Sequence, residues 1–108
     1  MHMKWKPGSK EFLWGDKALA EVVKSASAKG KVIGAICLSP VVLARAGVLA
    51  GKKATAYLDS ETVRELEKAG ATYKDAEVVI SGNIITARDP QAATKFAEAI
   101  VKRLPPAK

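Results

Sequence analysis

The stretch Val32-Ile-Gly-Ala-Ile-Cys-Leu-Ser-Pro40 decides the fold of this 108-residue chain. Its first five residues are apolar and rich in β-branched side chains, which predicts a buried strand that stops at Cys37. Pro40 and the apolar residues behind it predict that a helix begins there. Cys37 then lies in the turn between strand and helix. Because backbone amides at a helix N-terminus favour a thiolate, we expect the pKa of this cysteine, the only one in the chain, to be lowered.

The composition is that of one globular domain spanning residues 1–108. Hydrophobic residues make up 48% and charged residues 27% of the chain, as in ordinary soluble domains. No apolar run approaches the roughly 20 residues that a membrane span requires, and the N-terminus lacks an apolar secretory segment. A single cysteine forms no internal disulfide, which is typical of a reducing compartment. We therefore expect a cytoplasmic protein without a membrane partner.

The net charge of +7 raises the possibility of nucleic-acid binding, but the basic residues are spread along the chain. They stand mostly where cations cap helix ends or solvate a surface, and no aromatic side chains interleave with them as a base-stacking platform requires. We expect no nucleic-acid partner. One cysteine and one histidine cannot assemble a metal site, so neither a metal nor another cofactor is expected.

Helical and strand patterns alternate along the chain. A loop over residues 4–15 is expected to dock through Trp5, Phe12, Leu13 and Trp14. The following elements are predicted by apolar periodicity and cap residues: a helix capped by Asp16 to about Lys29, a short helix from Pro40 with Ser39 as its cap, a strand over Lys52–Leu58, and a helix from Asp59 or Ser60 to about Ala69 with Val63 and Leu66 inward.

The C-terminal third has the clearest patterns. Two β-branched runs, Glu77–Ile80 and Ile84–Ala87, flank Gly82-Asn83 and predict a hairpin. The last helix is predicted to be capped by Asp89, with one apolar stripe consisting of Ala93, Phe96, Ala97, Ile100, Val101 and Leu104. Arg88 is expected to tie a helix end or contact a second copy. Together the patterns predict an α/β sandwich with a mainly parallel sheet plus a hairpin.

Several linked motifs resemble the DJ-1/PfpI superfamily. That family's pattern is close to A-I-C-x-x-P followed by L-x-x-A-G-L-L-x-G-[KR]-x-x-T. The corresponding residues here are Ala35-Ile-Cys-Leu-Ser-Pro40 and Leu43-Ala-Arg-Ala-Gly-Val-Leu-Ala-Gly-Lys-Lys-Ala-Thr55. Further matches follow in order to the final helix, so that the resemblance covers residues 11–104.

The resemblance implies a flavodoxin-like three-layer sandwich, commonly dimeric, with a cysteine at a nucleophile elbow. In this family the cysteine serves peptidase-like, glyoxalase, deglycase, hydratase or redox-sensing roles. As an enzyme, the chain would use Cys37 to attack a small carbonyl compound or a peptide. Backbone amides near Leu38 and Gly8 would stabilise the oxyanion, and Tyr57 could donate a hydrogen bond.

The chain departs from the family pattern in its supporting residues. Family members carry some 60 or more further residues before this point, including strands next to the elbow strand and a glutamate that hydrogen-bonds the cysteine. The family's Gly-Gly falls at Trp5 and Lys6, which leaves only Gly8 in a comparable position. Leu38 and Tyr57 stand where branches of the family place histidines. Cys37 is therefore either a reactive but weakly catalytic thiol or a cysteine that packs at the end of a strand.

Two functions follow from these departures. The first is a cysteine enzyme of the DJ-1/PfpI type that is weak or inactive as the isolated chain. The alternative is a non-catalytic half-fold that oligomerises or binds a partner, because missing strands would leave an apolar strand edge open. The expected partner is a second copy of the chain or a separate chain that supplies the N-terminal strands.

Overall fold

A computed structural model describes residues 14–104 of the chain. Five helical segments and five strands follow one another along it. The elements are α2 (Lys17–Ala28), β1 (Ile33–Ile36), α3 (Pro40–Arg45), β2 (Lys53–Ala54), α4 (Ser60–Lys68), β3 (Thr72–Tyr73), β4 (Val78–Ser81), β5 (Ile84–Ala87), the 3-10 helix η1 (Pro90–Ala92) and α5 (Ala93–Arg103).

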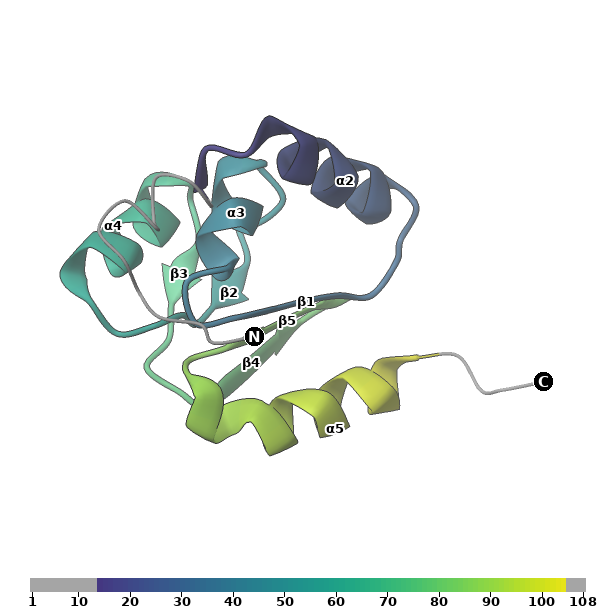
Figure 1. The fold of residues 1–108 in the computed structure, drawn as a ribbon, viewed down its shortest axis with the longest axis vertical. Helices are drawn as coiled ribbons and strands as arrows, with labels where there is room; N and C mark the ends of the chain where they lie inside the picture. The colour runs from purple at the N-terminus through teal and green to yellow at the C-terminus, as the bar shows by residue number, and fades with distance from the viewer. Residues whose placement is uncertain (1–13, 105–108) are drawn as a thin grey trace, which may run out of the picture.

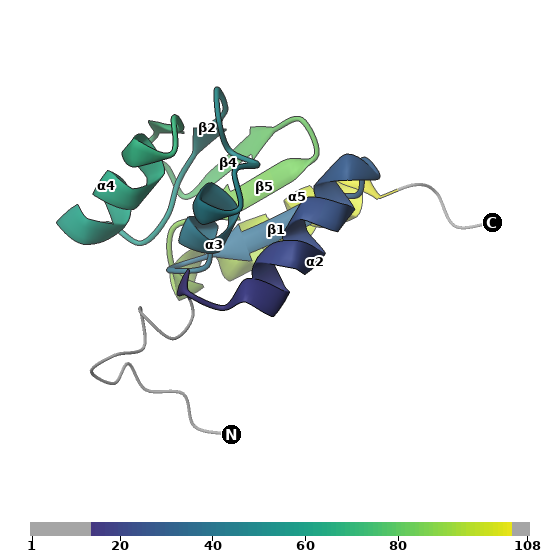
Figure 2. The same ribbon diagram turned by 90° about the horizontal axis from the view of Figure 1, so that it is seen from above.

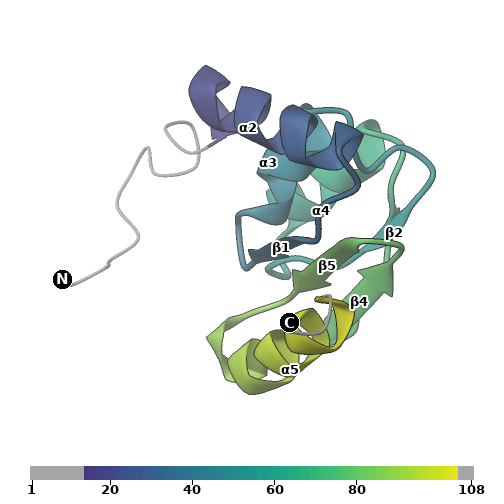
Figure 3. The same cartoon turned by 90° about the vertical axis from the view of Figure 1, so that its right-hand side faces the viewer.

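The main sheet has three strands in the order β1-β5-β4. β1 and β5 are parallel, with Ile33 opposite Ile84, and β4 and β5 form the predicted antiparallel hairpin. β2 and β3 form a separate parallel pair. Helices α2 and α3 lie on one side of the main sheet and α5 on the other (Figures 1 and 3). The predicted three-layer α/β sandwich with a mainly parallel sheet and a hairpin is therefore confirmed.

Helix α3 is the centre of the hydrophobic core. Val41 is fully buried, as are Leu49 and Leu66 beside it. α3 is also tied to α4 by a bidentate ion pair, in which Arg45 Nε and one terminal nitrogen donate to the carboxylate of Glu65 at 2.9 and 3.0 Å. Seen from above, α4 lies to one side of α3, whereas α2 runs beside β1 (Figure 2). The short helix after Cys37 is thus held from several sides.

The predicted helix caps are confirmed for two helices and wrong for two. Asp16 accepts a hydrogen bond from the Leu19 N–H, and Asp59 accepts one from the Glu61 N–H. Ser39 occupies the N-cap position of α3, but its backbone is already helical and its side chain makes no capping bond. Asp89 likewise makes no capping bond to η1, and its Oδ2 accepts from Arg88 Nε at 3.4 Å.

The strand predicted over Lys52–Leu58 is wrong beyond Ala54. After Ala54 the backbone leaves the regular ladder and finds other partners. The Thr55 N–H donates to Thr86 Oγ1 at 2.9 Å, and the Tyr57 N–H donates to the Cys37 carbonyl at 2.7 Å. These irregular bonds join the small β2–β3 sheet to the carboxyl end of the main sheet.

Two predictions of helix faces are also corrected. In α4, Thr62 is fully buried together with Leu66, whereas Val63 is only half-buried. Thr62 is tolerated there because its hydroxyl donates to Asp59 Oδ2 at 2.6 Å. In α5 the single predicted stripe is divided: Phe96 and Ile100 approach Gly34 on β1, and the rest of the stripe is exposed.

Gly34 permits the close approach of α5 to β1. A Cβ atom at this position would lie 2.8 Å from Ile100 Cδ1 and 3.0 Å from Phe96 Cζ. Contacts this short force neighbouring side chains to move, so the absence of a side chain at residue 34 sets the distance between helix and sheet.

We expect Gly34→Ala to lower the free energy of unfolding by about 1 to 3 kcal/mol, because the new methyl group overpacks this contact. Urea unfolding at one fixed protein concentration measures the change. Ile100→Val removes the Cδ1 methyl that lies nearest, and alone it should cost about 0.5 to 1.5 kcal/mol. In the double variant the loss should be smaller than the two single losses together. Additive losses would show that the contact with Ile100 is not the cause.

Candidate active site

Cys37 lies directly after β1 and three residues before Pro40, the first residue of α3. Its φ angle is +65°, which makes it the one non-glycine residue with a positive φ among residues 14–104. Its N–H donates to the Ala87 carbonyl at 3.0 Å, and its carbonyl accepts from the Tyr57 N–H at 2.7 Å. A left-handed conformation costs a cysteine free energy, and these two bonds hold it in place.

The residue after Cys37 is fixed by a tryptophan. Trp14 Nε1 donates to the Leu38 carbonyl at 3.0 Å in a buried hydrogen bond. The indole is only 6% exposed, and the Arg45 guanidinium lies over its ring at 5.4 Å. The prediction that Trp14 is a packing residue is therefore confirmed. Its hydrogen bond to the turn was not predicted, because nothing in the sequence links two residues so far apart. Trp5, Phe12 and Leu13 lie outside the described residues.

The thiol of Cys37 is half-buried, and its pKa is raised, not lowered as the sequence predicts. Burial is the largest cause, because it disfavours the charged thiolate. A backbone hydrogen bond from Leu38 acts in the opposite direction, and the nearby carboxylate of Asp89 raises the pKa further. The expected activation by the helix N-terminus does not prevail, because the partial burial of the thiol outweighs it.

Asp89 reaches the site from the neighbouring strand. Because β1 and β5 are parallel, their carboxyl ends meet at one edge of the sheet, where Cys37 follows β1 and Arg88 and Asp89 follow β5. Asp89 Oδ1 is buried and has no hydrogen-bond partner among residues 14–104. Oδ2 accepts from Arg88 Nε at 3.4 Å, and Arg88 also pairs with Asp75 at 3.1 Å. Arg88 thus joins the residue that precedes η1 to the loop before β4, and the predicted contact with a second copy stays a prediction.

The sequence analysis treated Asp89 only as a helix cap. An available signal was its place immediately after a strand that runs parallel to the strand before Cys37. An acidic residue in that position shares the sheet edge with the cysteine whatever it does for the following helix. Its electrostatic effect on Cys37 follows once the pairing of β1 with β5 is known, and the sequence does not show that pairing.

The other predicted site residues are placed as follows. Leu38 is buried, and its backbone contacts the thiol. Tyr57 is joined to Cys37 through its peptide N–H, while its side chain is 44% exposed. Gly8 lies outside the described residues. Within residues 14–104, no three His, Cys, Asp or Glu side chains are grouped so that they could hold a metal. In the same range no helix is long and apolar enough to cross a membrane.

Comparisons with known proteins identify close relatives. The model of the DJ-1/PfpI family matches residues 7–103. A Methanocaldococcus jannaschii protein, MJ0967, is 55% identical over 90% of this chain and 47% of its own length. Deglycase TK1284 of Thermococcus kodakarensis is 38% identical over 82% of this chain and 52% of its own. The crystal structure of Drosophila melanogaster DJ-1beta superposes with a TM-score of 0.77 at 34% identity, covering 90% of this chain and 50% of that chain. The chain thus spans about half the length of these relatives.

We expect Asp89→Asn to increase the rate at which iodoacetamide alkylates Cys37 at neutral pH, by roughly threefold to tenfold. The substitution removes a negative charge that raises the thiol pKa, so a larger fraction of thiolate is present at pH 7. The pH profile of the alkylation rate should move to lower pH by the decrease in the pKa of the thiol. Glu98→Gln removes an exposed carboxylate from α5 and should leave the profile unchanged. An unchanged profile in Asp89→Asn would mean that this carboxylate does not act on the thiol.

Proposed function

The chain belongs to the DJ-1/PfpI family, and from that premise we propose that Cys37 is the nucleophile of a deglycase-, glyoxalase- or peptidase-like reaction. The observation that carries the proposal is the positive φ of Cys37 at the carboxyl edge of the main sheet. A strained turn of this kind presents a side chain above the strand ends, and strain in a non-glycine residue is retained where a function requires it. The proposed substrate is a small carbonyl compound or a peptide.

In the proposed reaction the sulfur of Cys37 attacks the carbonyl carbon of the substrate. A carbon–sulfur bond forms, and the carbonyl oxygen takes up the electron pair of its broken π bond. The Leu38 N–H is the amide proposed to donate to this oxygen, because a backbone hydrogen bond from Leu38 lowers the pKa of the thiol. The amide near Gly8 is proposed as a second donor. The thiol must first lose its proton, and the free Oδ1 of Asp89 is the carboxylate oxygen proposed to receive it.

We infer that the 108-residue chain by itself turns substrate over, but weakly. The raised pKa of Cys37 leaves less thiolate at neutral pH than in a free cysteine. The chain also spans about half the length of deglycase TK1284. A location in the cytoplasm is proposed with this function, because a reducing compartment keeps the single thiol free.

A second candidate is a non-catalytic half-fold that oligomerises or binds a partner chain. The observation that favours it is the open side of β1: among the described residues, β1 pairs with β5 only. An unpaired strand edge is a template for another strand. The partner proposed is a second copy of the chain or a separate chain that supplies the strands of the other half.

We expect Cys37→Ser to reduce turnover of methylglyoxal or of a peptide substrate by about 10²-fold or more, because an alcohol at this position is not appreciably ionised. Substrate consumption by equal amounts of the two proteins measures the loss. Ser39→Ala removes a hydroxyl that caps nothing and should retain the rate of the unaltered chain. Equal turnover by Cys37→Ser and the unaltered chain would reject the enzymatic proposal and leave the half-fold as the function.

A further inference from the structure

The carbonyl group of Leu38, in the turn after β1, is held by a side chain from another part of the chain. Trp14 Nε1 donates to this carbonyl at 3.0 Å, and the Val41 N–H of α3 donates to it at 3.3 Å. By contrast, the two hydrogen bonds of the Cys37 backbone are made by other backbone groups. The indole bond is therefore the one among these contacts that a change of side chain can remove.

Leu38 is held on both sides of its own N–H group. On one side the Cys37 carbonyl accepts from the Tyr57 N–H at 2.7 Å, and on the other side the Leu38 carbonyl accepts from the indole. Because peptide groups are planar, these two contacts set the orientation of both peptide planes that meet at Leu38. The positive φ of Cys37 costs free energy, so the turn can relax once one contact is lost. The backbone hydrogen bond from Leu38 to the thiol therefore depends on both contacts.

The ring of Trp14 is held in turn by an ion pair. The Arg45 guanidinium lies 5.4 Å from the centre of the ring and over its face, an attractive arrangement of a cation and an aromatic ring. Two nitrogens of Arg45 donate to the two carboxylate oxygens of Glu65 at 2.9 and 3.0 Å, which fixes the plane of the guanidinium. Trp14 and the side chain of Glu65 are both largely buried. The direction of the indole N–H is therefore set by residues of α3 and α4.

We propose that Trp14 is a positioning residue for Cys37: its indole N–H fixes the Leu38 carbonyl, and with it the direction from which the Leu38 N–H meets the sulfur. The Arg45–Glu65 ion pair keeps the indole in the orientation that this contact requires. Trp14 acts on the sulfur through Leu38 and takes no part in bond making. The inference rests on the proposed function, in which Cys37 is the nucleophile, and it adds the residues that hold the nucleophile's amide donor in place.

The effect of this contact chain on the thiol is separable from the effects of charge. Of the described residues, Asp89 is the one whose charge raises the pKa of Cys37, and it reaches the thiol from the end of β5. Burial raises the same pKa, and the hydrogen bond from Leu38 lowers it. Neither Arg45 nor Glu65 is among these causes. A change at Glu65 is therefore expected to reach the thiol through the position of Trp14 and Leu38.

The first test is Trp14→Phe, which keeps an aromatic ring and removes the N–H donor. We expect the pH profile of Cys37 alkylation by iodoacetamide to move to higher pH, and the rate at neutral pH to fall by about threefold to tenfold, because the thiolate loses the hydrogen bond that favours it. Val23→Ala removes buried methyl groups from α2 and is the control for a loss of stability; it should leave the profile unchanged. An unchanged profile in Trp14→Phe, or an equal shift in Val23→Ala, would overturn the inference.

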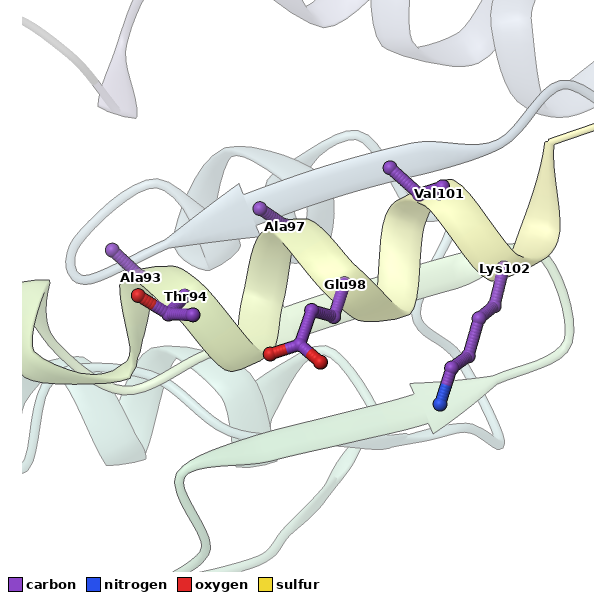
Figure 4. A pocket seen from close by; sticks show the side chains of 6 residues that line it. All are labelled: Ala93, Thr94, Ala97, Glu98, Val101 and Lys102. Carbon is purple, nitrogen blue, oxygen red and sulfur yellow. The ribbon is translucent and has the colours of Figure 1, made fainter.

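The second test leaves the tryptophan in place and separates position from charge. Glu65→Gln weakens the ion pair that holds Arg45 over the ring. If Glu65 acted through its charge, its loss would lower the pKa of the thiol and speed alkylation, whereas a loss of positioning slows alkylation, by about twofold or more. Glu98 extends from α5 towards β4 (Figure 4), and Glu98→Gln removes the same charge there without effect on the rate. Alkylation that is unchanged or faster in Glu65→Gln would overturn the inference.

Alkylation does not require turnover, so this inference and the proposed function can fail separately. If Trp14→Phe shifts the profile while Cys37→Ser turns methylglyoxal over as fast as the unaltered chain, the positioning role stands and the enzymatic proposal is rejected. If Cys37→Ser loses turnover while Trp14→Phe keeps the profile, the enzymatic proposal stands and the positioning role is rejected. Where both hold, Trp14→Phe should lower kcat for methylglyoxal by about threefold or more and leave KM nearly unchanged.

Discussion

The parallel pairing of β1 with β5 is the constraint on which the rest of the structure depends. It fixes Ile36 opposite Ala87 and so brings the residues that follow each strand, Cys37 and Asp89, to one edge of the sheet. The same pairing uses the backbone N–H and C=O groups on one side of β1. The N–H and C=O groups of Gly34 and Ile36 point to the other side. The electrostatics of the thiol and the open edge are two consequences of the same register.

The elements that were predicted correctly are marked by residues that lie next to them in the sequence. Asp16 and Asp59 precede apolar helical patterns and act as caps, and Gly82 lies in the turn of a hairpin. The failures occurred where a distant residue competes for the same atoms. The strand predicted after Ala54 ends because Thr55 and Tyr57 bond to Thr86 and Cys37. No pattern in the sequence predicts these hydrogen bonds between residues that are far apart along the chain.

The candidate site was predictable in position but not in chemistry. The strand-to-helix transition around Pro40 located Cys37 in the turn, and the family motif agrees with that location. The direction of the thiol pKa was predicted wrongly, because the sequence shows the helix start but not the degree of burial or the carboxylate brought in by β5. Burial and long-range charge are properties of the packed structure, so they could not be read from the stretch around Cys37 alone.

The distance along the chain between β1 and β5 has a consequence for folding kinetics. Ile33 pairs with Ile84, so about half of the chain must be placed before this pairing closes, whereas β4 and β5 are joined by a tight turn. Closing a long loop is slow compared with forming a hairpin. During synthesis β1 leaves the ribosome well before β5 exists, and for that period both of its edges are unsatisfied. The nascent chain is therefore most exposed to misassembly before its last third has been made.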